Sequence, residues 1–195
     1  TINGDVSIVD MNTFSTVGLF DLSPGPITQI AWGHDLSSIF VGDGKGAVIK
    51  LDLIEKKASI ITTSSVPVTC ISSCRTQYGV TAGFADGQIF LMVNSSSRQF
   101  RQFQAHDNLI SSICFHDCGF IIISSDINGC IRIWDATTLK CQKSIMLENS
   151  FINSLCLSNK QDSILVSSTS NLDDEGHLTL FSLPNLDKIS QFSGF

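Results

Sequence analysis

The segment that decides the fold reads ISSICF at residues 110–115, FIIISS at 120–125, CIRIWD at 130–135 and CQKSIML at 141–147. Each run is short, rich in β-branched or aromatic residues and separated from the next by turn residues, which is typical of β-strands. Asn128-Gly129 lies between the second and third runs, and this pair favours a tight hairpin because both residue types tolerate positive φ. The segment therefore predicts four consecutive antiparallel strands.

The same arrangement recurs along the chain. A glycine opens a β-patterned run that ends in Asp or a substitute for it, and these glycines are Gly4, Gly46, Gly87, Gly129 and Gly176. Successive glycines are 42, 41, 42 and 47 residues apart. A period of about 40–45 residues with four strands per unit is the signature of a β-propeller. The sequence predicts an all-β propeller of about four and a half antiparallel blades: a half blade at 1–22 and four-stranded blades at 27–64, 67–104, 110–147 and 151–195.

One repeat, from Ala105 to Asp135, resembles the WD-repeat family. The family's repeat begins with Gly-His and ends with Trp-Asp, and this chain has Ala105-His106 and Trp134-Asp135 at the family's usual spacing. The resemblance implies a buried, hydrogen-bonded structural tetrad made of His106, Ser124, Asn128 and Trp134. The family prefers Asp where Asn128 stands, so the histidine would lack a charged acceptor.

The other repeats depart further from the family's motif, with Met92, Leu51 and Phe181 where the tryptophan would stand. Propellers of this family usually close at seven blades. An open stack of blades would leave apolar faces and strand edges exposed. We therefore expect the chain to be part of a seven-bladed propeller whose remaining blades lie outside this sequence.

Composition narrows the class of protein. The chain is 43% hydrophobic and 15% charged, which indicates a globular domain, and its net charge of −6 makes nucleic acid an unexpected main ligand. No apolar run reaches the ~20 residues needed to span a bilayer. The seven cysteines are spread through apolar stretches and suggest buried free thiols in a reducing compartment. We expect an intracellular protein, cytoplasmic or nuclear.

The sequence predicts no catalytic residue, cofactor or metal site. The innermost strands of the expected blades offer only Ser, Thr, Asn, Gln and Cys as polar groups, which is a poor catalytic set. The glycine-rich stretch 42–46 lies in an expected hairpin with no helix behind it to bind a phosphate. The Cys-x-x-x-Cys pairs at 70–74 and 114–118 lack the tight spacing of zinc sites, and the acidic run 173–175 lacks the spacing of a calcium loop.

The prediction for function is a non-catalytic scaffold that binds other proteins, as part of a larger protein or complex. Its partner face would carry His106 and the hairpin turns, where the fifth repeat has an insertion. Loop insertions cost little entropy and often carry function. Phe84 is expected to be an exposed anchor within a charged rim. The candidate partner-binding residues are Asp43, Phe84, Asp107, Asn108, Asp126, Asn171, Asp173, Asp174 and Glu175.

An alternative function is a phosphoinositide-binding or nucleic-acid-binding adaptor. It would use local positive charges, which are Lys45, Lys50, Lys56, Lys57, Arg98 and Arg101. Binding of that kind would depend steeply on salt, because it releases counterions from the ligand.

Overall fold

The computed structural model describes residues 4–22, 25–76, 79–93 and 100–194. Within those ranges the chain forms only strands, turns and connecting segments, so no helix that could span a membrane occurs there. The strands are β1 (Asp5–Val9), β2 (Thr16–Asp21), β3 (Ile27–Trp32), β4 (Ser38–Asp43), β5 (Ala47–Asp52), β6 (Lys57–Thr63), β7 (Val68–Ser73), β8 (Gly79–Phe84), β9 (Gln88–Val93), β10 (Phe100–Gln104), β11 (Ile110–Phe115), β12 (Ile121–Asp126), β13 (Cys130–Asp135), β14 (Cys141–Met146), β15 (Ser150–Leu157), β16 (Ser163–Ser170), β17 (Gly176–Ser182) and β18 (Lys188–Ser193).

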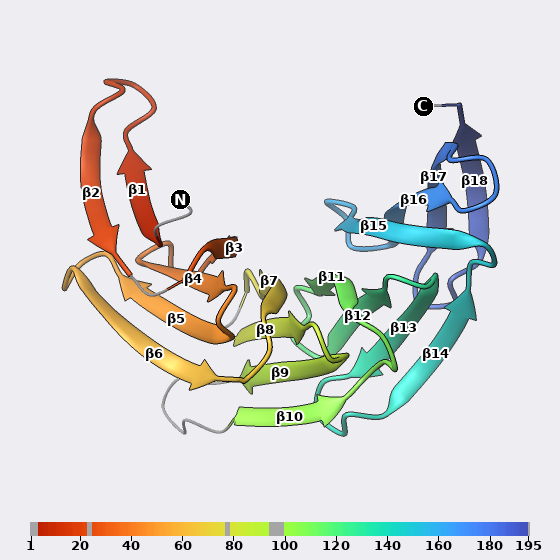
Figure 1. Ribbon diagram of the computed structural model, residues 1–195, viewed down its shortest axis with the longest axis horizontal. Helices are drawn as coiled ribbons and strands as arrows, with labels where there is room; N and C mark the ends of the chain where they lie inside the picture. Colours follow the sequence, from red (N-terminus) through yellow and green to blue (C-terminus); the bar gives the residue numbers. More distant parts are fainter. Residues whose placement is uncertain (1–3, 23–24, 77–78, 94–99, 195) are drawn as a thin grey trace.

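Each sheet is built from strands that follow one another in the chain. One sheet holds β1 and β2, and four-stranded antiparallel sheets hold β3–β6, β7–β10, β11–β14 and β15–β18. Figure 1 shows the sheets side by side in an open arc, with β3, β7, β11 and β15 on its concave side and β6, β10, β14 and β18 along its convex rim. Each of these inner strands contacts the inner strand of the next sheet. The predicted all-β propeller of four-stranded blades is confirmed.

The middle strands are buried because neighbouring blades cover both of their faces. Every residue of β4 and of β8 is buried, whereas the rim strands β6, β10, β14 and β18 are mostly exposed. Side chains alternate between the two faces of a strand, so one middle strand contributes to two different interfaces. Consecutive apolar residues in these strands are therefore a consequence of blade stacking.

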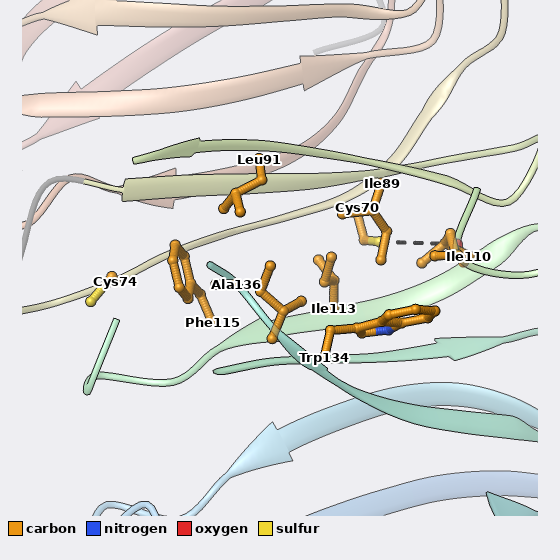
Figure 2. Close-up of a cluster of buried hydrophobic side chains, with 11 residues drawn as sticks. Cys70, Cys74, Ile89, Leu91, Ile110, Ile113, Phe115, Trp134 and Ala136 are labelled. Atoms are coloured by element: carbon orange, nitrogen blue, oxygen red, sulfur yellow. Dashed lines mark hydrogen bonds between the residues drawn. The ribbon is translucent and has the colours of Figure 1, made fainter. Parts of the chain in front are cut away.

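An apolar cluster fills each space between neighbouring blades. Figure 2 shows the cluster between β7–β10 and β11–β14, where Ile89 and Leu91 face Ile113 and Trp134. Cys70 and Cys74 belong to this cluster as buried thiols. The expectation of buried thiols was wrong for three of the seven cysteines, because Cys118, Cys141 and Cys156 are exposed. Burial of such side chains stabilises each blade through its neighbour, which is how stacked repeats gain stability.

The sheets at the two ends of the arc each have one face that no other described sheet covers. On β2, Val17 and Leu19 are 57% and 70% exposed, and on β18, Ile189 and Phe192 are 57% and 58% exposed. That further blades cover these two faces and close the ring stays a prediction from the sequence.

Three of the repeated glycines, Gly46, Gly87 and Gly129, lie where one blade's hairpin meets the main chain that leads into the next blade. Gly87 has φ of +82°, and a Cβ atom there would overlap the carbonyl oxygen of His106. The His106 N–H donates to the Gly87 carbonyl at 3.0 Å, so the two segments are held in this close approach. Only glycine suits both the backbone conformation and the available space.

Gly87→Ala is expected to destabilise the fold. The strained backbone conformation alone costs about 1–3 kcal/mol, and the clash adds to it. Gly194→Ala is the matched control, because Gly194 also has a positive φ, +93°, but a Cβ atom there would have no neighbour within 4 Å. Denaturant unfolding of the two variants measures the difference. Equal losses in the two would show that the close approach to His106 has no energetic role.

The hairpin between β16 and β17 is larger than its counterparts. β16 has 8 residues and β17 has 7, against 6 in each of β4, β5, β8, β9, β12 and β13. Its turn covers residues 171–175 and takes its positive φ at Asp174 rather than at a glycine. The extra residues therefore lengthen the hairpin beyond the end of the neighbouring blades.

Candidate functional site

A chain of hydrogen bonds links His106, Ser124, Asp126 and Trp134 in the space between two blades. The indole Nε1 of Trp134 donates to Ser124 Oγ at 2.9 Å, and Ser124 Oγ lies 2.7 Å from His106 Nε2. His106 Nδ1 lies 3.3 Å from Asp126 Oδ2. Because the carboxylate only accepts, Nδ1 carries the proton and the Ser124 hydroxyl donates to Nε2.

The fourth member of this network is Asp126, so the assignment of Asn128 from the resemblance was wrong. Asn128 is exposed in the turn, and its main-chain N–H donates to Asp126 Oδ1 at 3.0 Å. The same oxygen accepts from the Cys130 N–H at 3.0 Å. Asp126 follows Ser124 by two residues on β12, so both side chains point to the same face, whereas Asn128 lies beyond the end of the strand. The histidine therefore has the charged acceptor that the sequence analysis expected it to lack.

Burial keeps His106 neutral at physiological pH. Its side chain is fully buried, and desolvation lowers its pKa to about 4, with a nearby Arg132 acting in the same direction. Asp126 opposes this shift without reversing it. At neutral pH the Nδ1–H of the neutral His106 imidazole therefore donates to Asp126, and the network fixes the segment between β10 and β11 to the blade β11–β14.

The stability of the fold is expected to fall below pH 6.5 because of His106. A histidine with a pKa of 6.5 when unfolded and about 4 when folded binds fewer protons in the folded state, so its contribution is complete above pH 6.5 and is lost as the pH falls toward 4. The full loss is on the order of 3 kcal/mol. Denaturant unfolding at pH 7 and pH 4.5 measures it, with His106→Gln as the reference. The same pH dependence in both proteins would contradict this origin.

Three possible metal ligands meet at this network, but each already has a partner. Atoms of His106, Asp126 and Cys130 lie within 4.8 Å of one another. Both imidazole nitrogens are used within the network, and Cys130 Sγ lies 3.6 Å from Ser144 Oγ. The arrangement is thus suited to holding blades together.

Three of the predicted partner-binding residues, Asp43, Phe84 and Asp126, lie inside the protein and are 2%, 1% and 3% exposed. They occupy equivalent strand positions, each opposite the first paired residue of the inner strand. The prediction that Asp126 belongs to an exposed partner face was therefore wrong, because its carboxylate is used in the network with His106. Asp43 Oδ1 accepts from the N–H groups of Lys45 and Ala47 at 3.0 and 2.7 Å. The prediction that Phe84 is an exposed anchor was wrong, because this position points into the space between blades.

The remaining predicted residues lie at one end of the sheets, which we call the hairpin face. We define it as the turns at 44–46, 85–87, 127–129 and 171–175 together with the segments that connect one blade to the next at that end. Asp107 is exposed there and Asn108 is half-buried, and Asn108 Nδ2 donates to Asp126 Oδ2 at 3.4 Å. All five residues of the enlarged turn 171–175 are exposed.

The basic residues of the alternative function that the structure describes do not form one patch. Lys45 lies in the turn between β4 and β5, whereas Lys56 and Lys57 lie at the opposite end of β5. Lys50 Nζ is 3.9 Å from Asp52 Oδ2, and the Arg101 guanidinium donates to the carbonyl of Thr137. Arg98 lies outside the described residues.

The inner strands use their polar side chains to bind one another. Gln29 Oε1 accepts from the Ile71 N–H at 2.7 Å. Ser72 Oγ accepts from Phe115 N–H, and Ser112 Oγ from Leu155 N–H, each at 3.0 Å. Sequence analysis missed this role, although these pairs are 42 or 43 residues apart and so follow the repeat. The inner strands are thereby linked from blade to blade.

Comparison with known proteins agrees with this architecture. Residues 97–135 match the family described as WD domain, G-beta repeat. The chain is similar to one chain in the crystal structure of the mitotic checkpoint complex, with a TM-score of 0.82 and 15% sequence identity over 97% of this chain and 58% of that one. At this identity the likeness concerns the fold alone, and 1456 chains of solved structures match, so it selects no particular activity. No curated protein matches the sequence.

Proposed function

We propose that this chain is a non-catalytic scaffold that binds other proteins through its hairpin face, because residues 97–135 match the WD-repeat family and the described strands form four-stranded blades. We further propose that it acts as part of a larger protein or a multiprotein complex in an intracellular, reducing compartment, cytoplasmic or nuclear. The seven free cysteines support that location.

The observation that carries the proposal is the enlarged, acidic turn at 171–175. It extends beyond the neighbouring blades, all five of its residues are exposed, and it includes Asp173, Asp174 and Glu175. These side chains add nothing to the apolar cores. A loop that is longer than its counterparts and contributes no packing is a good candidate for recognition on a rigid scaffold.

Neutralising this turn tests the proposal. The variant D174N/E175Q removes two negative charges from the turn, and E55Q/D187N removes two from exposed turns at the opposite end of the sheets. Proteins that the wild-type chain captures from a cell lysate are identified and quantified by mass spectrometry for both variants. We expect loss of captured proteins for D174N/E175Q only. Retention of every captured protein by a folded D174N/E175Q chain would reject the hairpin face as the binding surface.

A further inference from the structure

His106 lies between the blades β7–β10 and β11–β14. The equivalent position between the blades β11–β14 and β15–β18 holds no histidine. In β11–β13 the register pairs Ile110 with Asp126 and Ile122 with Trp134. The equivalent pairs in β15–β17 are Ile152 with Ser168 and Ile164 with Phe181. Ser168 and Phe181 thus stand where the acid and the indole of the network stand. His106 precedes Ile110 by four residues, and the residue that precedes Ile152 by four is an exposed glutamate, Glu148.

A pocket of about 370 Å³ lies at this position, between the blades β11–β14 and β15–β18. Its buried wall is polar at Ser168 and Thr179 and aromatic at Phe181, which are 3%, 4% and 3% exposed. Glu148 and His177 also line it. The pocket therefore offers hydrogen-bonding groups beside an apolar ring, and its lining includes residues of the segment that leads from β14 into β15.

His177 lies on the same wall of the pocket as Ser168, with which it pairs across β16 and β17. Among the residues that the structure describes, its Nδ1 is the buried side-chain nitrogen or oxygen that has no hydrogen-bond partner. Because neighbouring atoms cover Nδ1, the ring contributes to the pocket through its other atoms.

The charge around the pocket favours a cation. Leu172 of the turn 171–175 lines the pocket, and that turn carries Asp173, Asp174 and Glu175. Glu148 adds a further negative charge at the rim, and the lining residue that opposes these acids is Lys188. Hydrogen bonds from Ser170 and from the Glu175 N–H lower the pKa of Asp173, and the proximity of His177 adds to this shift. Asp173 therefore stays ionised close to the pocket at neutral pH.

We propose that this pocket receives an arginine side chain from a partner protein. The guanidinium group carries five N–H donors, so it can donate both to the hydroxyl groups of the wall and to the Glu148 carboxylate. Its aliphatic stem packs against Phe181 and Leu172. The proposal rests on the hairpin face being the partner surface and names the chemical group that this surface recognises.

Binding of capped pentapeptides to the whole chain tests the proposal. The probes are Gly-Gly-Arg-Gly-Gly and its counterparts with lysine, with neutral citrulline and with glutamate at the central position. NMR signals of the His177 ring, assigned with His177→Gln, report occupancy of the pocket. We expect a saturable shift with the arginine peptide, weaker binding of the lysine peptide, and none of the citrulline or glutamate peptides. An unmoved His177 signal, or equal shifts with citrulline, would overturn the proposal.

Two variants locate the binding. Glu148→Gln removes a charge from an exposed position, and Thr179→Val removes a hydroxyl while keeping the side-chain shape, so both are expected to fold. Each should weaken binding of the arginine peptide on the order of tenfold, whereas Glu55→Gln, at the opposite end of the sheets, should leave it unchanged. Equal effects of Glu148→Gln and Glu55→Gln would contradict a specific site.

The outcome separates this proposal from the proposed function. If D174N/E175Q loses captured proteins but the arginine peptide does not move the His177 signal, the hairpin face binds partners and the pocket proposal is wrong. If the arginine peptide binds at His177 but D174N/E175Q keeps every captured protein, the pocket is a binding site and the enlarged turn is not the partner surface.

Discussion

Replacing Trp134 with alanine is expected to lower the free energy of unfolding by about 3–5 kcal/mol, as is usual for a large buried aromatic side chain. Trp134 is 6% exposed and lies edge-on to Phe103, with ring centroids 5.1 Å apart. It belongs to the cluster between two blades that also contains Ile89 and Ile110. The substitution also removes the indole donor of Ser124, so the loss includes a hydrogen bond within a buried network.

Denaturant unfolding monitored by circular dichroism measures this loss. Phe120→Ala is the matched control, because Phe120 is an aromatic residue that is 61% exposed in the turn before β12. The control is expected to change stability by no more than about 0.5 kcal/mol. A loss of a few kcal/mol in the control, or none in Trp134→Ala, would contradict the assignment of Trp134 to the core between the blades.

Replacing Phe84 with alanine is expected to cost a similar amount, about 3–5 kcal/mol. Phe84 lies at the end of β8, is 1% exposed, and packs with Val68, Val80 and Ala82 between the blades β3–β6 and β7–β10. The aromatic ring fills the place that Asp43 and Asp126 hold in other blades, so its removal leaves a cavity rather than a lost surface contact.

The control for this variant is Phe120→Ala, since Phe120 is 61% exposed in the turn before β12. Unfolding midpoints and binding of captured proteins are measured on the same samples. A Phe84→Ala chain of unchanged stability that has lost its captured proteins would restore the surface-anchor interpretation. A destabilised chain whose folded fraction binds as the wild type does would exclude it.

The spacing of residues along the chain was enough to predict the blades. Strand runs, hairpin glycines and the recurrence at 41–42 residues are local properties, because the alternation of side chains and the need for positive φ act within a few residues. His106, Ser124 and Trp134 could be placed together because the repeat fixes their separations. The larger fifth hairpin followed from the single spacing of 47 residues.

The tertiary structure decided which face each side chain occupies and what it meets there. Asp126 rather than Asn128 binds His106, and Phe84 points inward, because the pairing of each strand with its neighbours determines which residues reach the space between blades. The hydrogen bonds between inner strands likewise join residues from different blades. The pocket at His177 is also lined by residues of two blades. Such contacts depend on how one sheet stacks on the next. The sequence of a single repeat contains no information about how far apart two stacked sheets lie.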